Sequence, residues 1–228
     1  MHSITFNGHS CSDFGLVTVD AGRRQRAEEQ IDEFEIPYRN GDLIIHSGKY
    51  KPYLREMEFA VMDKTKINLI NAGLVGRGIL TTSLDQGGFF IASVISGLSY
   101  QQFLNNIDTF KVGFKVNPFF YLDSGKTIVN ITSTPKTLVN LGTKYSEPLI
   151  KITGSGDITL TINTQVVVFT GVIGYISIDT ELMACYKDTL NTGDKMTGLF
   201  PVLVTGINTI SYTGTVTKIE ITPRWREL

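Results

Sequence analysis

The stretch that decides the fold is Phe34 to Tyr50, which reads FEIPYRNGDLIIHSGKY. From Phe34 to Tyr38, apolar residues alternate with Glu and Pro, which is the period of a half-buried strand. Asn40-Gly41 follows and favours a tight hairpin turn, because both residue types tolerate a positive φ. Leu43 to Ile45 resume the apolar character, and Ser47-Gly48 predicts a second turn. The stretch therefore predicts a β-hairpin with an architectural role.

The composition is that of a folded chain of one or two domains. The 228 residues are 42% hydrophobic, which is enough to build cores and argues against disorder. The net charge is −1; residues 1–122 hold 12 Lys+Arg against 13 Asp+Glu, and residues 123–228 hold nine of each. Neither half has the basic surplus that neutralises phosphates, so nucleic-acid binding is not expected. We find no signal peptide and no apolar run of the roughly 20 residues that span a bilayer, so synthesis in a cytosol without membrane insertion is expected.

A strongly polar segment precedes the predicted hairpin. Residues 21–33 contain one large apolar residue, Ile31, and place Arg23, Arg24 and Arg26 ahead of four acids. Without an apolar face, the segment does not predict a stable helix. It predicts an exposed loop, which is either simply solvated or an ordered contact with a neighbouring subunit.

The rest of the first half predicts strands and one short helix. Residues 64–74 carry apolar side chains at i, i+3 and i+7 behind Asp63, a suitable N-cap, and predict the helix. Arg55 interrupts the apolar face of one predicted strand, and Asn117-Pro118 is expected to end another. Apolar and alternating segments predict strands at residues 3–6, 14–19, 53–62, 78–83, 89–95 and 110–116.

The second half has no helical periodicity. We place the domain boundary after Leu122, before the polar turn 123–126, which divides the chain into domains 1–122 and 123–228. Many short apolar segments follow, separated by turn signals such as Gly154 to Asp157, and this pattern is typical of an antiparallel sandwich. The whole chain is therefore predicted to be all-β, mainly antiparallel, with one short helix.

The sequence predicts no catalytic, cofactor or metal site, and hence no enzyme. His2, His9 and His46 have no Cys, Asp or Glu at metal-ligand spacing. Cys11 and Cys185 lie far apart in the chain, and two buried thiols are favoured over a disulfide, although both remain open.

Aromatic residues of the second half raise one alternative. Small β-sandwiches often bind sugars by stacking them on aromatic rings, and Tyr212 and Trp225 are the candidate platform here. The same residues are also common in sandwich cores, and the sequence does not assign their faces.

The order of several motifs along the chain resembles the distal tail protein (Dit) family of long, flexible-tailed phages that infect Gram-positive bacteria. The combination is more specific than any one motif, and it covers essentially the whole chain. The motifs are IPYRNGDLIIHSGKY (36–50), KVNPFFY (115–121), YSEPLIKITGSGDITLTIN (145–163), YISIDTELMACY (175–186) and MTGLFPVLVTGINTISYTGTVTKIEITPRWREL (196–228).

The resemblance implies a structural protein of the virion at the distal tail tip, made in the host cytoplasm. It implies a homo-hexameric ring built by an N-terminal β-sandwich or barrel domain, with a galectin-like C-terminal β-sandwich outside it. The ring would join the tail tube protein to a tail-associated lysin or fibre protein, and in some relatives to receptor-binding proteins held by long insertions. The second half has only 106 residues, so a large insertion is not expected.

Two functions follow as hypotheses from these observations. In the first, the chain is a hub whose assembly contacts include Arg23, Arg24, Arg26, Arg39 and Asp42. In the second, the C-terminal domain is a carbohydrate-binding module that acts in adsorption to the host cell surface.

Overall fold

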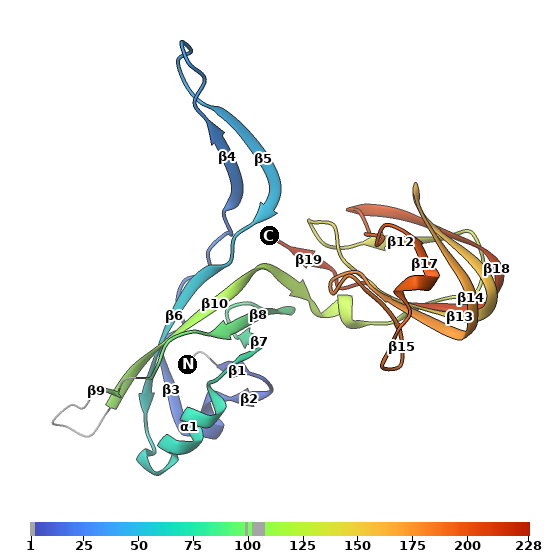
Figure 1. Ribbon diagram of the computed structural model, residues 1–228. Helices are drawn as coiled ribbons and strands as arrows, with labels where there is room; N and C mark the ends of the chain where they lie inside the picture. The colour runs from blue at the N-terminus through green and yellow to red at the C-terminus, as the bar shows by residue number, and fades with distance from the viewer. Residues whose placement is uncertain (1–2, 99, 102–107) are drawn as a thin grey trace. The chain divides into compact units, whose positions relative to one another are not determined.

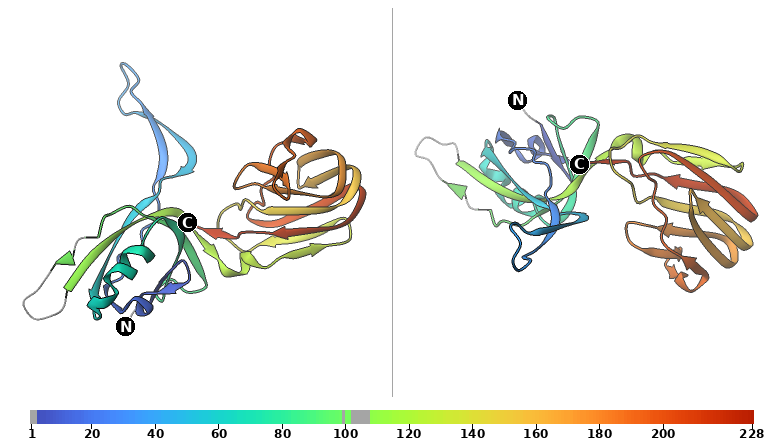
Figure 2. Two further views of the ribbon diagram at one scale, coloured as in Figure 1. Left: turned by 60° about the horizontal axis from the view of Figure 1, so that its bottom comes forward. Right: turned by 90° about the horizontal axis from the view of Figure 1, so that it is seen from above.

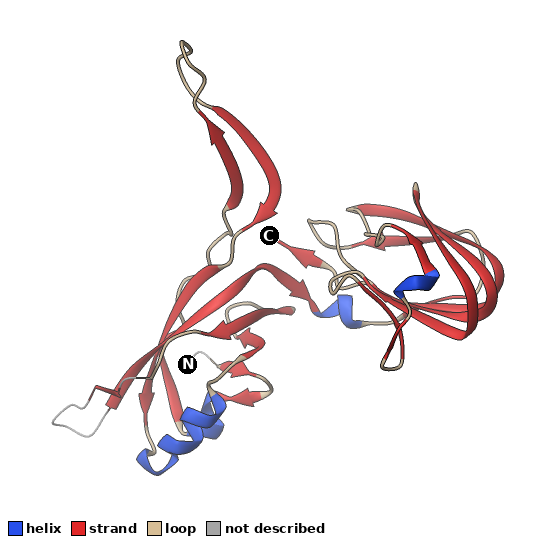
Figure 3. Cartoon of the chain, in the orientation of Figure 1, coloured by secondary structure: helices blue, strands red, loops and turns tan. Residues whose placement is uncertain are grey.

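The chain folds into two compact units. The computed structural model describes residues 3–98, 100–101 and 108–228. Contacts within the chain divide it into a first unit, Met1–Phe120 with Leu228, and a second unit, Tyr121–Glu227. Both units are built from mainly antiparallel β-strands, with one short α-helix in the first (Figures 1 and 3). The prediction of an all-β chain with one short helix is confirmed.

The first unit is organised around one large sheet with the strand order β2-β1-β7-β8-β10-β6-β3. β10 and β6 pair in antiparallel register along the full length of β6, from Asp108 opposite Val61 to Val116 opposite Tyr53. The strands of this unit are β1 (Ile4–Phe6), β2 (His9–Ser10), β3 (Leu16–Asp20), β4 (Glu29–Phe34), β5 (Leu43–Tyr50), β6 (Tyr53–Val61), β7 (Arg77–Thr82), β8 (Gly88–Val94), β9 (Tyr100–Gln101) and β10 (Asp108–Leu122, whose last two residues belong to the second unit).

Alternating side chains of these strands form the core of the first unit. Met57 and Phe59 on β6 and Val112 and Phe114 on β10 are fully buried, as the alternating pattern predicts. Phe6 on β1 meets Phe114 edge to face, with ring centroids 5.5 Å apart. The sheet is thus held by cross-strand contacts between residues distant in the sequence.

The predicted helix is confirmed, although it is shorter than the segment 64–74 that carries the apolar pattern. A 3₁₀ turn, η2 (Lys64–Lys66), leads into α1 (Ile67–Gly73), and a second 3₁₀ turn, η1 (Cys11–Phe14), lies in contact with it. The side chain of Asp63 accepts a hydrogen bond from the backbone N–H of Thr65 at 3.0 Å, so it caps this segment as expected. Ile70 and Leu74 are buried and anchor this segment.

β10 does not end at Asn117-Pro118, so that expectation was wrong. The strand continues to Leu122, although its pairing with β6 stops at Val116. Pro118 therefore lies beyond the last residue that pairs with β6, where its missing N–H removes no bond to β6.

The second unit contains one strongly curved sheet with the order β11-β18-β13-β14-β15-β16, with β12 paired to β18 and β17 paired to β14 (Figure 1). Its elements are the 3₁₀ turns η3 (Asp123–Lys126) and η4 (Gly193–Lys195) and the strands β11 (Val129–Ile131), β12 (Lys136–Asn140), β13 (Leu149–Ile162), β14 (Gln165–Asp179), β15 (Ala184–Lys187), β16 (Leu190–Asn191), β17 (Met196–Gly198), β18 (Gly206–Thr222) and β19 (Arg226–Glu227).

The strands of the second unit are longer than the sequence predicts. Gly154 to Asp157 was expected to be a turn, but it lies inside β13, where the register with β14 shifts between Gly156 and Ile158. The glycines lie at a β-bulge, which bends the strand without ending it. The buried face of these strands is rich in Ile, Leu and Val, and the core residues include Ile150, Ile152, Leu160, Val167, Phe169, Ile178, Ile210, Ile219 and Trp225.

Candidate functional site

A two-stranded sheet formed by β4 and β5 alone is exposed along nearly all of both strands. We call residues 29–50 the arm, and residues 35–42, which connect its strands, the tip loop. Glu29 pairs with Tyr50 at the base, and Phe34 pairs with Leu43 next to the tip loop. The arm projects from the large sheet in each view (Figures 1 and 2).

The structure confirms the β-hairpin predicted for residues 34–50 and corrects the predicted positions of its turns. Asn40-Gly41 lies within the longer tip loop, so it does not form the predicted two-residue turn. Ser47-Gly48 is a bulge in β5, where the Ser47 hydroxyl donates to the carbonyl oxygen of Gln30 at 2.6 Å. Residues 29–33, expected to belong to an exposed loop, form β4. The prediction assumed strands half-buried on a core, whereas both strands of the arm are exposed.

Both faces of the arm carry exposed apolar side chains. The register places Phe34, Leu43 and Ile45 on one face and Ile31 and Ile44 on the other. These five side chains are 40–52% exposed. Leaving apolar side chains in water is unfavourable, so an element that exposes them on both faces is a candidate surface for contact with another macromolecule.

The arm is also acidic. Its carboxylates outnumber its cations, Arg39 and Lys49. His46 lies 3.1 Å from Glu29, whose other oxygen accepts the backbone N–H of Gly48 at 3.1 Å, so this acid secures the bulge. The carboxylates are Glu29, Asp32, Glu33, Glu35 and Asp42.

A buried arginine fastens the base of the arm to the large sheet. Arg55 on β6 is 1% exposed, which explains why it could interrupt an apolar face. Its Nε donates to the carbonyl oxygen of Ala21 at 3.0 Å, and its Nη1 donates to Asp85 at 2.9 Å. Asp85 also accepts a hydrogen bond from the Thr82 hydroxyl at 2.7 Å. Arg55 thus holds the segment that enters the arm against the strands below it.

The five predicted assembly residues lie in the tip loop and on the segment that leads to the arm. Arg39 and Asp42 are exposed in the tip loop, and Arg23 and Arg26 are exposed on the segment that leads to the arm. Arg24 lies 3.6 Å from Asp85, and its guanidinium stacks 4.7 Å from the ring centroid of Phe120 and 5.4 Å from that of Phe90. Arg24 therefore stabilises the base of the arm within its own chain. A role of these residues in assembly stays a prediction.

Gly22 makes the tight approach at the base possible, and its substitution should be costly. It has a φ of +66°, and a Cβ added there would lie 2.2 Å from the carbonyl oxygen of Glu56. Gly22→Ala should destabilise the first unit by about 2–4 kcal/mol, because it combines backbone strain with a clash against the main chain. Gly8, with a φ of +81° and no neighbour within 4 Å of such a Cβ, is the matched control and should cost about 1 kcal/mol. Thermal unfolding followed by circular dichroism measures both, and equal costs would contradict the close approach.

The second unit contains an open apolar groove. We call it the groove; its volume is about 760 Å³. Leu199 and Met183 on its walls are 84% and 73% exposed. Its lining residues are Tyr145, Glu147, Thr180, Glu181, Met183, Gly198, Leu199, Phe200 and Val202.

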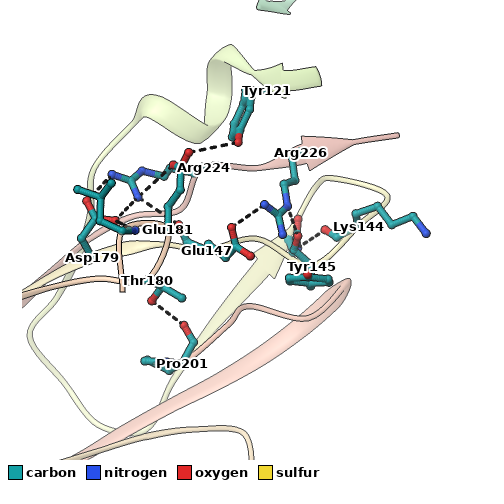
Figure 4. Close-up of polar contacts among 12 residues, drawn as sticks. Tyr121, Lys144, Tyr145, Glu147, Asp179, Thr180, Glu181, Pro201, Arg224 and Arg226 are labelled. Carbon is teal, nitrogen blue, oxygen red and sulfur yellow. Dashed lines mark hydrogen bonds and ion pairs between the residues drawn. The ribbon is translucent and has the colours of Figure 1, made fainter. Parts of the chain in front are cut away.

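Two arginines hold the walls of the groove in place (Figure 4). Arg224 donates two hydrogen bonds to buried Asp179, at 2.7 and 2.8 Å, and lies 3.4 Å from Glu181. Arg226 donates to Glu147 at 2.7 Å and to the carbonyl oxygen of Tyr145 at 2.7 Å. These charge-assisted bonds make the groove a preformed surface.

The pair of Arg224 and Asp179 predicts a specific loss of stability in acid. Burial raises the pKa of Asp179, but hydrogen bonds from Arg224 and from backbone N–H groups outweigh burial, so the pKa lies below its usual value. Such a carboxyl stabilises the fold above its unfolded pKa of about 3.9, and this contribution is lost as the pH falls through the folded pKa.

We therefore expect the second unit to lose stability below about pH 4. Arg224→Met should lower the free energy of unfolding of the second unit by about 1–3 kcal/mol at neutral pH. The stability of this variant should fall less steeply in acid, because the salt-bridge contribution is already absent. Trp225, the single tryptophan of the chain, lies in the core of this unit and reports its unfolding by fluorescence. Lys126→Met, which removes an exposed pair with Asp123, is the control. An unchanged acid slope in Arg224→Met would contradict the assignment.

The predicted sugar platform is wrong for Trp225. This side chain is 3% exposed and belongs to the core, so its ring cannot stack on a sugar. Tyr212 is half-buried and packs against the same core. The two rings therefore do not form an exposed pair.

The two cysteine thiols are buried and do not form a disulfide, as favoured from the sequence. Cys11 and Cys185 are both free and buried. Burial, helped by the charge of Asp13, raises the pKa of the Cys11 thiol to about 12, and burial also raises the pKa of Cys185. His2 lies outside the described residues. Within the described ranges, no group of three His, Cys, Asp or Glu residues is placed to hold a metal ion, and no helix is long and apolar enough to cross a bilayer.

Comparison with known proteins gives one result that spans both units. No protein-family model and no curated protein sequence matches the chain. Among solved structures, the chain is similar to the Dit protein of phage SPP1, described as a paradigm of hub adsorption apparatus in Gram-positive infecting phages. The TM-score is 0.76 at 10% sequence identity, and the match covers 97% of this chain and 98% of the SPP1 chain. The chain therefore has the fold of the SPP1 Dit protein, and the resemblance inferred from its motifs is confirmed for the fold.

Proposed function

We propose that the chain is a structural component of a phage tail tip, acting as a hub between the tail tube and the device that contacts the host. The observation that carries this proposal is the fold shared with SPP1 Dit over nearly the full length of both chains. A fold alone does not fix a function, but a match that keeps both units in order is more specific than a likeness of one common domain.

We propose that six copies form a closed ring through the first unit. A closed ring needs a head-to-tail interface, in which each copy contributes two different patches. The exposed apolar surface of the arm supports its assignment as one patch, because a neighbouring copy would bury it. The net charge of −1 is compatible with close packing of several copies, which a strong like charge would oppose.

The remaining partners follow by analogy with the Dit family. One face of the ring would meet the tail tube protein, and the other would carry a tail-associated lysin, a fibre or a receptor-binding protein. The chain itself performs no chemical step in this proposal. The second unit runs only from Tyr121 to Glu227, so it has no room for a long inserted domain.

Labelling of intact particles tests this function. Antibodies raised against the purified chain should bind the distal tip of the tail when virions are viewed by negative-stain electron microscopy. Antibodies against the tail tube should mark the whole tail and serve as the control. Labelling of the head or along the entire tail would refute the proposed place of this protein.

A further inference from the structure

The groove of the second unit combines an apolar lining with charges of one sign. Its exposed apolar walls include Met183 and Leu199, with Phe200 beside them, and its volume of about 760 Å³ can hold a few side chains. Of the described residues that line it, two are charged, and both are glutamates, Glu147 and Glu181. Such a surface is complementary to a partner that is apolar and positively charged.

The two glutamates are fixed in place and still reach solvent. Oε2 of Glu147 accepts a hydrogen bond from Arg226 at 2.7 Å, and Oε2 of Glu181 lies 3.4 Å from Arg224. Neither arginine is among the residues that line the groove. The side chains of Glu147 and Glu181 are 27% and 25% exposed, so a bound partner can contact both carboxylates.

The arginines do not cancel the negative charge beside the groove. Arg224 also holds the buried carboxylate of Asp179, at 2.7 Å. Three carboxylates thus share two guanidinium groups, which leaves one negative charge in excess. The ammonium group of Lys144 points away from these carboxylates (Figure 4). A cation on the partner would therefore be attracted to the groove.

The walls of the groove are ordered by hydrogen bonds between them. The Thr180 hydroxyl donates to the carbonyl oxygen of Pro201 at 3.0 Å (Figure 4). The side-chain amide of Gln165 exchanges two hydrogen bonds with the backbone of Val202, each 2.9 Å long. A partner therefore meets a preformed surface, which lowers the entropic cost of binding.

One apolar side chain of the groove projects from a strained backbone position. Met183 has a φ of +51°, a region that residues with side chains seldom occupy. Its side chain is nevertheless 73% exposed, so packing within its own unit does not account for the strain. Backbone strain of this kind is typical of residues that contact a ligand or a partner.

We propose that the groove binds a peptide segment of a different protein of the particle, in which large apolar side chains flank a lysine or arginine. The apolar side chains would pack against Met183 and Leu199, and the cation would face Glu147 and Glu181. This inference rests on the proposed function, because it names a surface on which the hub holds a partner. The ring is assigned to the first unit, so ring formation does not use the groove.

A peptide fits the lining better than a glycan does. Sugars stack on exposed aromatic rings, whereas the most exposed apolar side chains of the groove are Leu199 and Met183, at 84% and 73%. The ring of Tyr145 packs against the guanidinium of Arg226, 4.5 Å from the ring centroid. Methionine is enriched in protein interfaces, because its flexible side chain adapts to apolar partners.

Fluorescence polarisation with labelled peptides and the full-length chain tests the proposal. The probe peptide carries leucines on both sides of a lysine within a Gly-Ser frame. One control peptide has glutamate in place of the lysine, and the other has serines in place of the leucines. The probe should bind about 10-fold more tightly than either control. Glu181→Gln should reduce the preference for lysine over glutamate about 5-fold, because one carboxylate is removed.

A matched pair of variants locates the binding site. Leu199→Lys removes an apolar contact and repels the cation of the probe, so it should weaken binding about 30-fold. Leu199 is so exposed that the substitution should not affect folding. Leu190→Lys introduces the same charge at a 69% exposed residue that does not line the groove, and it should bind the probe normally.

The contrary outcomes separate this inference from the hub proposal. No binding of the probe at millimolar concentration, equal binding of all three peptides, or unchanged binding by Leu199→Lys would overturn the inference and leave the hub proposal intact. Binding of chitotetraose that Leu199→Lys abolishes would identify a glycan site and would also overturn it. In mass photometry, Leu199→Lys should assemble like the unmodified chain; a specific loss of its assembly would show that the groove is a contact between copies, which refutes the proposed partner.

Discussion

A chain whose arm is cut away should fold normally and fail to assemble. Replacing residues 30–49 with a short Gly-Ser turn joins Glu29 to Tyr50, which already pair at the base of the arm. The large sheet of the first unit does not include β4 or β5, so its stability should change by less than about 1 kcal/mol.

Assembly should instead be lost, because the arm carries the apolar surface that a neighbouring copy would bury. Five side chains that are 40–52% exposed are removed together. Truncation of such an interface should weaken association by at least 100-fold, which corresponds to about 2.7 kcal/mol. Sedimentation velocity at matched concentrations measures this effect. An armless chain that assembles as well as the unmodified chain would show that the arm is not an assembly element.

Loss of the Arg55 guanidinium should be the most damaging single substitution in the first unit. Arg55→Met leaves Asp85 buried without its closest cation and frees the carbonyl oxygens of Ala21 and Gly22. Breaking a buried, hydrogen-bonded ion pair by removing one partner costs about 3–5 kcal/mol.

The second unit provides an internal control for this experiment. Trp225 fluorescence reports only the second unit, so its unfolding transition should stay in place while the circular dichroism transition of the first unit moves to lower temperature. Asp85→Asn in the Arg55→Met background should recover part of the stability, because the unpaired buried charge is removed. A cost below about 1 kcal/mol, as for an exposed pair, would contradict the role assigned to Arg55.

Local patterns in the sequence predicted the parts of the fold that depend on local chemistry. The alternation from Phe110 to Val116 predicted a strand with one buried face, and Asp63 predicted the start of the short helix; both are confirmed. The sequence favoured two buried thiols at Cys11 and Cys185 over a disulfide, and both are free and buried. In each case the deciding neighbours lie within a few residues along the chain.

Features set by distant partners could not be predicted. Gly154 to Asp157 carries a turn signal, but its bulge depends on the register of β14, and glycine composition does not encode that register. Arg55 looked like an interruption of an apolar strand face, because its partner Asp85 is 30 residues away. Trp225 was compatible with a sugar platform or a core, and only the packing of the strands decides between these.

The arm shows a further limit of sequence patterns. Alternation from Phe34 predicted a strand half-buried on its own core, yet the structure leaves that apolar surface in solvent. An apolar pattern predicts that a surface will be buried, but it does not predict whether the same chain or another molecule buries it. The two exposed acidic strands and the tip loop are nevertheless the most informative functional feature of the chain.

The central claim, that copies of this chain form a closed ring, is tested most directly by the mass of the purified full-length protein. Mass photometry with a concentration series, supported by negative-stain imaging, should show rings with a mass about six times the 25.2 kDa of one chain. A particle of 25.2 kDa at every concentration, with no ring in the images, would contradict the claim.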